Sequence, residues 1–204
     1  MKVLIIIPAY NEEESIEKVI NNLKQNYSQY DYVIINDGSH DHTSEICHKN
    51  KYKIIDLPVN LGLTGAFQTG LKYAYKKGYD YAIQFDADGQ HLPEYIPAMV
   101  DKIEEGYDMV IGSRFVEKPK PRSLRMLGSR VISTAIKITT GVHIADPTSG
   151  MRLFNKTLIR EFAENINYEP EPDTVSFLIK QGVKVAEVQV EMKEREAGES
   201  YLNL

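Results

Sequence analysis

The chain has 204 residues, with 24 Lys or Arg against 29 Asp or Glu and a net charge of −5. Its length is typical of one substantial domain, and 42% hydrophobic residues exclude an intrinsically disordered chain. The single cysteine, Cys47, excludes a disulfide framework and a cysteine-based zinc site, so a reducing compartment such as the cytoplasm is expected. The apolar run over residues 3–7 is far shorter than the roughly 20 residues that span a bilayer. The negative charge argues against non-specific nucleic-acid binding.

Apolar runs alternate with amphipathic stretches along the first 112 residues. Strands are predicted where β-branched and aromatic residues run together, and helices where apolar residues recur at helical spacing. The expected elements are strands over 3–7, 32–35, 52–57, 81–85 and 109–111, and helices that open after Asn11, run from Asp41 and Thr43 to Cys47, and span 62–77. Strands that are apolar throughout and are separated by helices predict an α/β fold with a mainly parallel sheet. Such a sheet binds ligands at the carboxyl ends of its strands.

This alternation breaks after residue 112. Residues 116–122 hold two prolines and three basic residues and are predicted to form a loop. Apolar residues at 124, 127, 131, 135 and 138 predict a helix with one apolar stripe, residues 156–166 predict another helix, and residues 186–192 predict a half-buried strand. The last residues are charged and then apolar at Tyr201, Leu202 and Leu204, as expected of a chain that continues into a membrane-associating extension.

Acidic and turn residues directly follow three of the predicted strands. PAYNEE at 8–13 follows the first strand, NDGS at 36–39 the second and DADGQH at 86–91 the fourth. One carboxylate after a strand is usually a helix cap or a turn anchor, but three such segments at one sheet edge indicate a site. Asp86 and Asp88 can direct two carboxylates at one Mg²⁺ or Mn²⁺ ion that also binds substrate phosphates. The alternative is a turn in which both bond the backbone and Gly89 supplies a positive φ.

Five motifs in order resemble glycosyltransferase family 2 with the GT-A fold: PAYNEE at 8–13, NDGSHDHT at 36–43, DADGQH at 86–91, GSRF at 112–115 and DPTSGMRLF at 146–154. The similarity covers about residues 3–200, and the most similar branch is that of dolichyl-phosphate mannose synthase and bacterial polyprenyl-phosphate glycosyltransferases. The resemblance implies one GT-A domain over residues 1–204, with a nucleotide-sugar-binding half over 1–112 and an acceptor half over 113–204. It also implies an inverting, metal-dependent transfer from a UDP- or GDP-sugar.

On the donor side, the resemblance implies a role for residues after each of the three strands. Asp37 would accept a hydrogen bond from the base, Glu12 would lie near the ribose or base, and Gly62–Gly65 would form a loop along the nucleotide. Asp86 would lie close to the sugar diphosphate, and Asp88 and Gln90 would hold the metal. The full set of implied nucleotide-sugar contacts is Pro8, Ala9, Tyr10, Glu12, Asp37, Gly65, Asp86, Ala87 and Asp88.

On the acceptor side, Arg114 would bind the phosphates or the acceptor, although it could instead pair with Glu117 at the surface. Asp146 would be a catalytic carboxylate or orient the acceptor, although it could instead cap a tight turn fixed by Pro147. The catalytic candidates are therefore Asp86, Arg114 and Asp146. The candidate contacts to the acceptor or phosphates are Arg114, Arg122, Arg125, Arg130, Arg195 and Ser200, of which the last two belong to an R-x-x-G-x-S element.

Residues 114–130 hold six basic residues against Glu117 alone, a local charge of +5 in a negative chain. Such a run is usually a solvated face. Beside an apolar stripe it also fits a polyprenyl phosphate acceptor at an anionic membrane surface. The sequence therefore predicts a cytoplasmic enzyme that is peripheral at the inner face of the cell membrane.

Two other enzyme classes fit the sequence less well. A nucleotidyltransferase opens with a glycine-rich, basic loop, whereas this chain has no Lys or Arg between Lys2 and Lys18. An aspartyl-phosphate phosphatase carries its Asp-x-Asp pair after the first strand rather than the fourth. Transfer to the hydroxyl of a glycan acceptor and a non-catalytic nucleotide-sugar-binding subunit stay open as alternatives. The sequence identifies neither the sugar, the base nor the oligomeric state.

Overall fold

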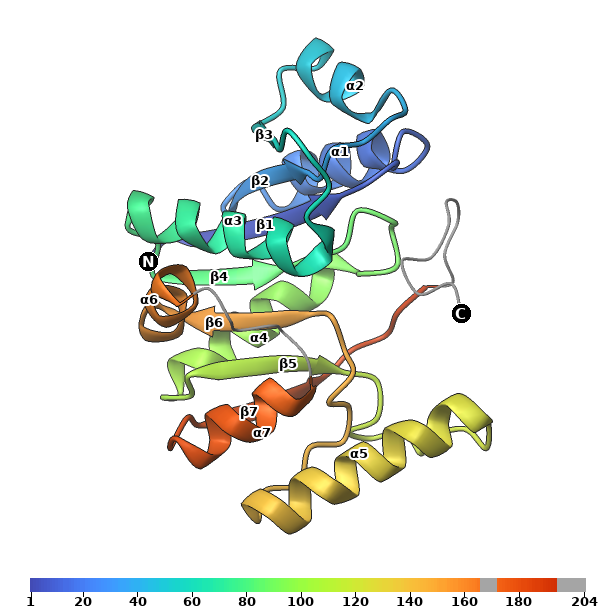
Figure 1. Ribbon diagram of the computed structural model, residues 1–204, viewed down its shortest axis with the longest axis vertical. Coiled ribbons are helices and arrows are strands. Elements are labelled where there is room, and N and C mark those ends of the chain that lie inside the picture. Colours follow the sequence, from blue (N-terminus) through green and yellow to red (C-terminus); the bar gives the residue numbers. More distant parts are fainter. Residues whose placement is uncertain (166–171, 194–204) are drawn as a thin grey trace.

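The computed structural model describes residues 1–165 and 172–193, without the side chains of residues 124 and 125. Its centre is a seven-stranded sheet in the order β3-β2-β1-β4-β6-β5-β7 (Figure 1). The strands are β1 (Val3–Ala9), β2 (Asp31–Asn36), β3 (Ile54–Asp56), β4 (Tyr81–Gln84), β5 (Met109–Ser113), β6 (Arg152–Asn155) and β7 (Val185–Gln189). Only β6 is antiparallel to its two neighbours, β4 and β5. The predicted α/β class with a mainly parallel sheet is confirmed.

Helices cover both faces of the sheet (Figure 1). One face packs against α1 (Ile16–Asn26), α2 (Thr43–Lys49) and α4 (Ile96–Glu104), which follows the short 3-10 helix η1 (Pro93–Tyr95). The other face packs against α3 (Gly62–Lys77), α6 (Lys156–Glu164) and α7 (Pro172–Lys180). Helix α5 (Leu124–Thr140) contacts α7 and lies far from β1 to β3. The sheet's predicted ligand edge is therefore left uncovered by the helices of the two layers.

Alternate residues of β1 supply the two cores. Ile5 and Ile7 face the core shared with α1, and Leu4 and Ile6 face the core shared with α3. All seven residues of the strand are buried, as expected of a central parallel strand. A Cβ on Gly70 would lie 2.2 Å from Ile6 Cγ2, so a glycine is what lets α3 approach β1 this closely. This tight contact holds the beginning of α3 beside the ends of β1 and β2.

The structure differs from the predicted elements in several places. β1 continues through Pro8, which pairs in register with Ile35, and β3 is shorter than predicted. α4, β6 and α7 were not predicted, although the buried residues of α4 recur at helical spacing. On α3, Tyr75 interrupts the buried face of the helix: it is 41% exposed and donates its hydroxyl to Glu164. Acidic and turn residues nevertheless still closely follow the ends of β1, β2 and β4.

Candidate active site

The segments after β1 and β2 are joined by hydrogen bonds at the carboxyl edge of the sheet. Asp37 N donates to Ala9 O at 2.8 Å, and Asn11 N donates to Ser39 Oγ at 3.0 Å. Asn11 has a left-handed φ of 54°, and its side-chain oxygen accepts from His40 N at 2.8 Å. The PAYNEE and NDGS segments therefore form one rigid rim, as the parallel topology predicts.

Asp37 is wholly buried at the end of β2. Its Oδ1 accepts from Leu61 N at 2.7 Å, just before α3, whereas its Oδ2 is buried without a hydrogen-bond partner among the described residues. Burial raises the pKa of this carboxyl, and hydrogen bonds from the Leu61 and Gly62 backbone offset only part of that effect. A buried acceptor without a donor costs free energy, so this oxygen is suited to accept a hydrogen bond from a ligand.

Glu12 and Gly65 have clear structural roles of their own. Glu12 is 5% exposed; its Oε2 accepts from Ser15 Oγ at 2.6 Å and its N donates to Thr43 Oγ1 at 2.8 Å. The expectation of a loop over 62–65 is wrong, because these residues form the first turn of α3. A Cβ on Gly65 would lie 2.4 Å from Leu61 Cβ, so the side chain of Leu61 folds back over this turn. Their contacts with a nucleotide stay predictions, as do those of Pro8, Ala9 and Tyr10.

The DADGQH segment after β4 is organised by His91. This residue is 4% exposed, its Nδ1 accepts from Asp86 N at 2.9 Å, and its Nε2 lies 3.5 Å from Asp86 Oδ2. Because Nδ1 is an acceptor, the neutral ring carries its proton on Nε2. The Phe85 ring packs edge-on against His91 at 5.5 Å between centroids. His91, which the sequence did not single out as a site residue, therefore fixes the backbone and the carboxylate of Asp86.

Asp88 belongs to the turn that the alternative interpretation predicted. Its Oδ1 accepts from Gln90 N at 3.0 Å, and Gly89 has a φ of 78°. Gln90 Nε2 donates to Lys193 O at 3.4 Å, and an amide oxygen is a donor of the kind that a divalent cation takes. Within residues 1–165 and 172–193, no three His, Cys, Asp or Glu side chains gather as a metal cluster. The oxygen donors of Asp86, Asp88 and Gln90 nevertheless fit Mg²⁺ or Mn²⁺, because Mg²⁺ usually takes one or two carboxylates together with substrate phosphates.

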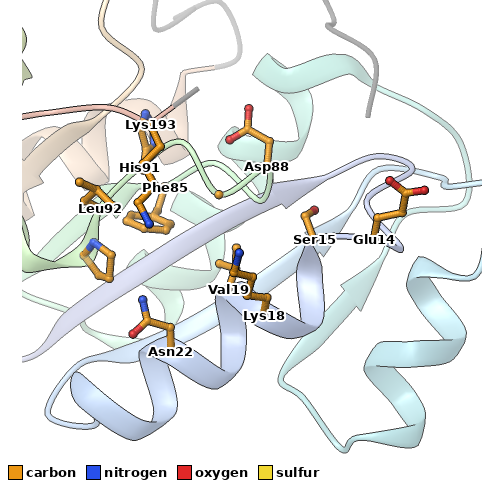
Figure 2. Close-up of a pocket in the computed structure, with 12 residues that line it drawn as sticks. Glu14, Ser15, Lys18, Val19, Asn22, Phe85, Asp88, His91, Leu92 and Lys193 are labelled. Carbon is orange, nitrogen blue, oxygen red and sulfur yellow. The ribbon is translucent and has the colours of Figure 1, made fainter. Parts of the chain in front are cut away.

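A cavity of about 160 Å³ lies beside this turn. Its lining residues come from α1 and from the segment that leads into η1 (Figure 2). Val19, Phe85 and Leu92 form apolar walls, and Glu14, Lys18 and Asn22 project from α1 and the turn before it. Asp88 and Gly89 border the cavity, whereas Tyr10, Glu12 and Asp37 are not part of its lining. The cavity therefore adjoins the predicted metal site and not the predicted base site.

Arg114, which directly follows β5, forms a bidentate ion pair with Asp146. Arg114 Nε donates to Asp146 Oδ2 at 2.7 Å, and Nη2 donates to Oδ1 at 2.9 Å. Asp146 also accepts from Arg114 N and Thr148 Oγ1. Burial alone would raise the pKa of Asp146, but the hydrogen bonds and charge of Arg114 outweigh it, so the pKa is lowered. Arg114 therefore pairs with Asp146 rather than with Glu117.

A family model described as Glycosyl transferase family 2 matches residues 4–162. The chain belongs to this family. It is 33% identical over 213 residues to a UDP-N-acetylglucosamine–dolichyl-phosphate N-acetylglucosaminyltransferase of Methanococcus voltae, covering 92% of this chain and 84% of the relative. It is 30% identical over 216 residues to an undecaprenyl-phosphate mannosyltransferase of Micrococcus luteus, covering 100% and 88%. The chain is therefore a glycosyltransferase, as its motifs predicted.

The fold of this glycosyltransferase also matches solved structures. Glucosyl-3-phosphoglycerate synthase from Mycobacterium tuberculosis, in complex with Mn²⁺, uridine diphosphate and phosphoglyceric acid, superposes with a TM-score of 0.72 at 20% identity, over 97% of this chain and 72% of that chain. At this identity the likeness concerns the fold. The predicted GT-A architecture is confirmed.

The glycosyltransferase holds Asp146 in place through residues that the sequence did not single out. Glu187 on β7 accepts from Ala145 N at 2.7 Å and from Asp146 N at 2.8 Å. Arg152, 3% exposed, donates to Ser149 O and Pro147 O, both at 2.9 Å. A buried arginine in a short strand and a glutamate in an alternating strand have no distinguishing pattern along the chain, because their partners come from distant segments.

The basic segment after β5 is packed onto α5. Lys120 Nζ donates to Ser129 Oγ and Ser133 Oγ, both at 2.9 Å, and burial lowers the pKa of Lys120. Arg130 Nη2 donates to Lys120 O at 2.7 Å, so this predicted phosphate contact also binds the loop backbone. Arg122 is exposed. The side chain of Arg125 and all of Arg195 and Ser200 lie outside the described residues.

The apolar stripe predicted for α5 faces outward. Leu127 is 54% exposed, Val131 62% and Ile138 79%, whereas Ser129 and Ser133 are buried. A surface helix normally buries its apolar face, so this orientation is unusual. None of the described helices is both long enough and apolar enough to cross a bilayer. We call Leu127, Val131 and Ile138 the outer face of α5.

Proposed function

We propose that the chain transfers a sugar, with inversion, from a nucleotide-diphosphate sugar to a polyprenyl phosphate at an anionic membrane surface, with Mg²⁺ or Mn²⁺. The observation that carries this proposal is the Arg114–Asp146 pair: the predicted acceptor half offers a positioned cation, and its buried carboxylate is fully engaged. The relatives from Methanococcus voltae and Micrococcus luteus are named for dolichyl-phosphate and undecaprenyl-phosphate acceptors, which supports the same acceptor class here.

The donor would occupy the rim formed after β1, β2 and β4. Asp37 Oδ2, buried without a partner among the described residues, would accept a hydrogen bond from the base. Asp88 and Gln90 would hold the cation and Asp86 would lie beside the sugar diphosphate. When bound, the divalent ion would neutralise charge on the departing diphosphate. The uridine diphosphate and Mn²⁺ in the neighbouring synthase complex support this arrangement.

The acceptor oxygen would need little activation by the protein. A phosphate monoester has a second pKa near 6, so a polyprenyl phosphate is largely anionic at neutral pH. Arg114 would orient that phosphate for one in-line displacement, which inverts the anomeric carbon. Asp146 is a poor general base because Arg114 occupies both of its oxygens and its pKa is lowered. Its role would be to hold Arg114 in place.

The outer face of α5 would dock on the membrane. Its exposed side chains lie on the helix that carries Arg130 and Lys137 and that follows the exposed Arg122. An amphipathic helix of this kind inserts its apolar side at the headgroup boundary while basic residues attract anionic lipids. The acceptor's lipid chain would then stay in the bilayer while its phosphate reaches Arg114. This would make the enzyme peripheral at the inner face of the cell membrane.

A transfer assay tests the proposal. The purified chain is incubated with labelled UDP- and GDP-sugars, Mn²⁺ or Mg²⁺, and polyprenyl phosphate in anionic vesicles. We expect one donor to give a lipid-linked sugar of inverted anomeric configuration, and chelation of the metal to stop the reaction. Sugar transfer to glycan hydroxyls alone, or donor binding with no transfer to any acceptor, would replace the proposal with one of the two alternatives that the sequence left open.

A further inference from the structure

We propose that Gln84 and Gly150 form a subsite for one hydroxyl group of the transferred sugar, next to Asp86. This inference rests on the proposed function, because it requires a nucleotide-sugar donor. It adds the residue that discriminates between sugars, which neither the motifs nor the comparisons identify.

Gln84 is a buried amide in an otherwise apolar strand. It is 2% exposed at the end of β4, and its neighbour in register on β1 is Ile6. Its Oε1 is buried without a hydrogen-bond partner in the part of the chain that the structure describes. Buried polar atoms almost always have a partner, and an aliphatic residue would fit this site without that cost. A buried amide kept at this position therefore points to a polar ligand beside it.

Gly150 lies beside the amide nitrogen of Gln84 and so marks where the sugar hydroxyl would lie. A Cβ built on Gly150 would be 3.4 Å from Asp86 Oδ2, 3.7 Å from Gln84 Nε2 and 3.7 Å from His91 Cε1. Gly150 is not among the glycines with positive φ, so its backbone does not require a glycine. The absent side chain instead leaves space at the point where three polar side chains meet. This space lies between Asp86 of the predicted donor half and Gly150 of the predicted acceptor half, where the sugar would lie during transfer.

The chemistry of this space suits a hydroxyl group. A hydroxyl both donates and accepts, and a glutamine amide offers an acceptor oxygen and donor hydrogens. Asp86 would accept a second hydrogen bond from the sugar. A site built to hydrogen-bond a substrate hydroxyl strongly rejects the analogue that lacks it, because buried polar groups are then left unpaired. Gln84 would therefore set the preference for a sugar that carries a hydroxyl at one ring position.

The test compares Gln84→Leu with Gln68→Leu. Gln68 lies on α3 and donates to the carbonyl oxygens of Phe162 and Asn165, so it is a matched glutamine outside the site. For each variant, kcat/KM is measured with the preferred nucleotide sugar and with its deoxy analogues, one ring position at a time. Affinity for the nucleotide diphosphate with Mn²⁺ and the midpoint of thermal unfolding are measured alongside. Gln84→Met is carried in parallel in case the leucine variant unfolds.

We expect Gln84→Leu to lower kcat/KM for the parent nucleotide sugar about tenfold or more. For one deoxy analogue, its kcat/KM should equal that of the wild type. Nucleotide-diphosphate affinity should not change, and the unfolding midpoint should rise, because an unpaired buried amide is removed. Gln68→Leu should leave unchanged the ratio of kcat/KM for the parent sugar to kcat/KM for each deoxy analogue. Unchanged ratios in both Gln84 variants would overturn the subsite and leave the proposed function intact. A wild-type chain that turns over no nucleotide sugar would overturn both.

Discussion

Asp37 and Asp146 are both wholly buried, yet their pKa values shift in opposite directions. Asp37 has one oxygen without a partner among the described residues, and burial raises its pKa. Asp146 has both oxygens bound by Arg114, which lowers its pKa despite the burial. The partner rather than the depth of burial therefore decides the direction of the pKa shift. The predicted donor half keeps hydrogen-bonding capacity for a ligand, whereas the predicted acceptor half uses its carboxylate internally.

The largest effect should come from the metal site on the donor side. Asp88→Ala should lower turnover at least about 10²- to 10³-fold, because the charge that develops on the diphosphate would lose its stabilisation. Chelation of divalent ions should lower turnover of the wild type to a similar extent. Asp56→Ala is the matched control, since Asp56 also ends a strand but is bonded to Asn36, Ser44 and His48. Normal turnover without divalent metal would contradict the site.

The next effect concerns membrane binding by the basic segment. Reversing Arg122 and Arg125 to Glu changes the local charge by four units, and each basic residue near an anionic surface contributes about 1 kcal/mol. Binding to anionic vesicles, measured by sedimentation, should weaken by several kcal/mol, and the difference should shrink as salt is added. Donor hydrolysis should survive, because the predicted nucleotide site is built from other segments.

Two controls separate the basic segment from net charge and general hydrophobicity. Reversing Lys76 and Lys77, exposed at the end of α3, changes the net charge equally and should leave vesicle binding nearly unchanged. Val131→Asp on the outer face of α5 should weaken binding, whereas Val59→Asp should not, although the two valines are similarly exposed at 62% and 58%. If the arginine and lysine reversals weakened vesicle binding equally, or if the two valine variants did, α5 would not be the membrane contact.

A smaller effect is expected at the base site. Asp37→Asn keeps the acceptor for Leu61 N but replaces Oδ2 with an amide that donates. Nucleotide affinity should fall by at least about 1.5 kcal/mol, roughly tenfold, because a hydrogen bond to a charged acceptor is lost. Calorimetric titration with UDP and GDP measures the change, and Asp56→Asn serves as its control. Unchanged affinity would remove Asp37 from the base site.

The same variant should change the pH dependence of stability. The pKa of Asp37 is raised in the folded chain, so folding favours the protonated form. Its contribution to stability is therefore lost as pH rises through the ordinary value near 3.9 toward the raised pKa. Asp37→Asn should be at least as stable as the wild type at pH 7 and lose that advantage in acid. Urea unfolding at both pH values measures this, and a variant less stable at pH 7 would contradict the pKa assignment.

The sequence predicted the strand ends better than the contacts between distant segments. Asp86 and Asp88 could be identified because they follow a buried strand and lie one residue apart. The pairing of Arg114 with Asp146 could not be predicted, since 32 residues separate them and Glu117 was a nearer partner. Gln84 resembles an ordinary strand residue until its Oε1 is seen in three dimensions to lack a partner among the described residues. The outward orientation of the α5 stripe depends on tertiary packing, because helical periodicity gives a face but not its direction.

The most direct test of the account is the Asp146→Asn variant, assayed with two kinds of acceptor. We expect transfer to polyprenyl phosphate to slow by less than about tenfold, because an anionic phosphate needs no general base and asparagine keeps one acceptor oxygen for Arg114. Thermal unfolding checks that the variant is folded. A loss of two or more orders of magnitude in kcat, with transfer to a glycan hydroxyl as the main wild-type reaction, would make Asp146 the base and contradict the account.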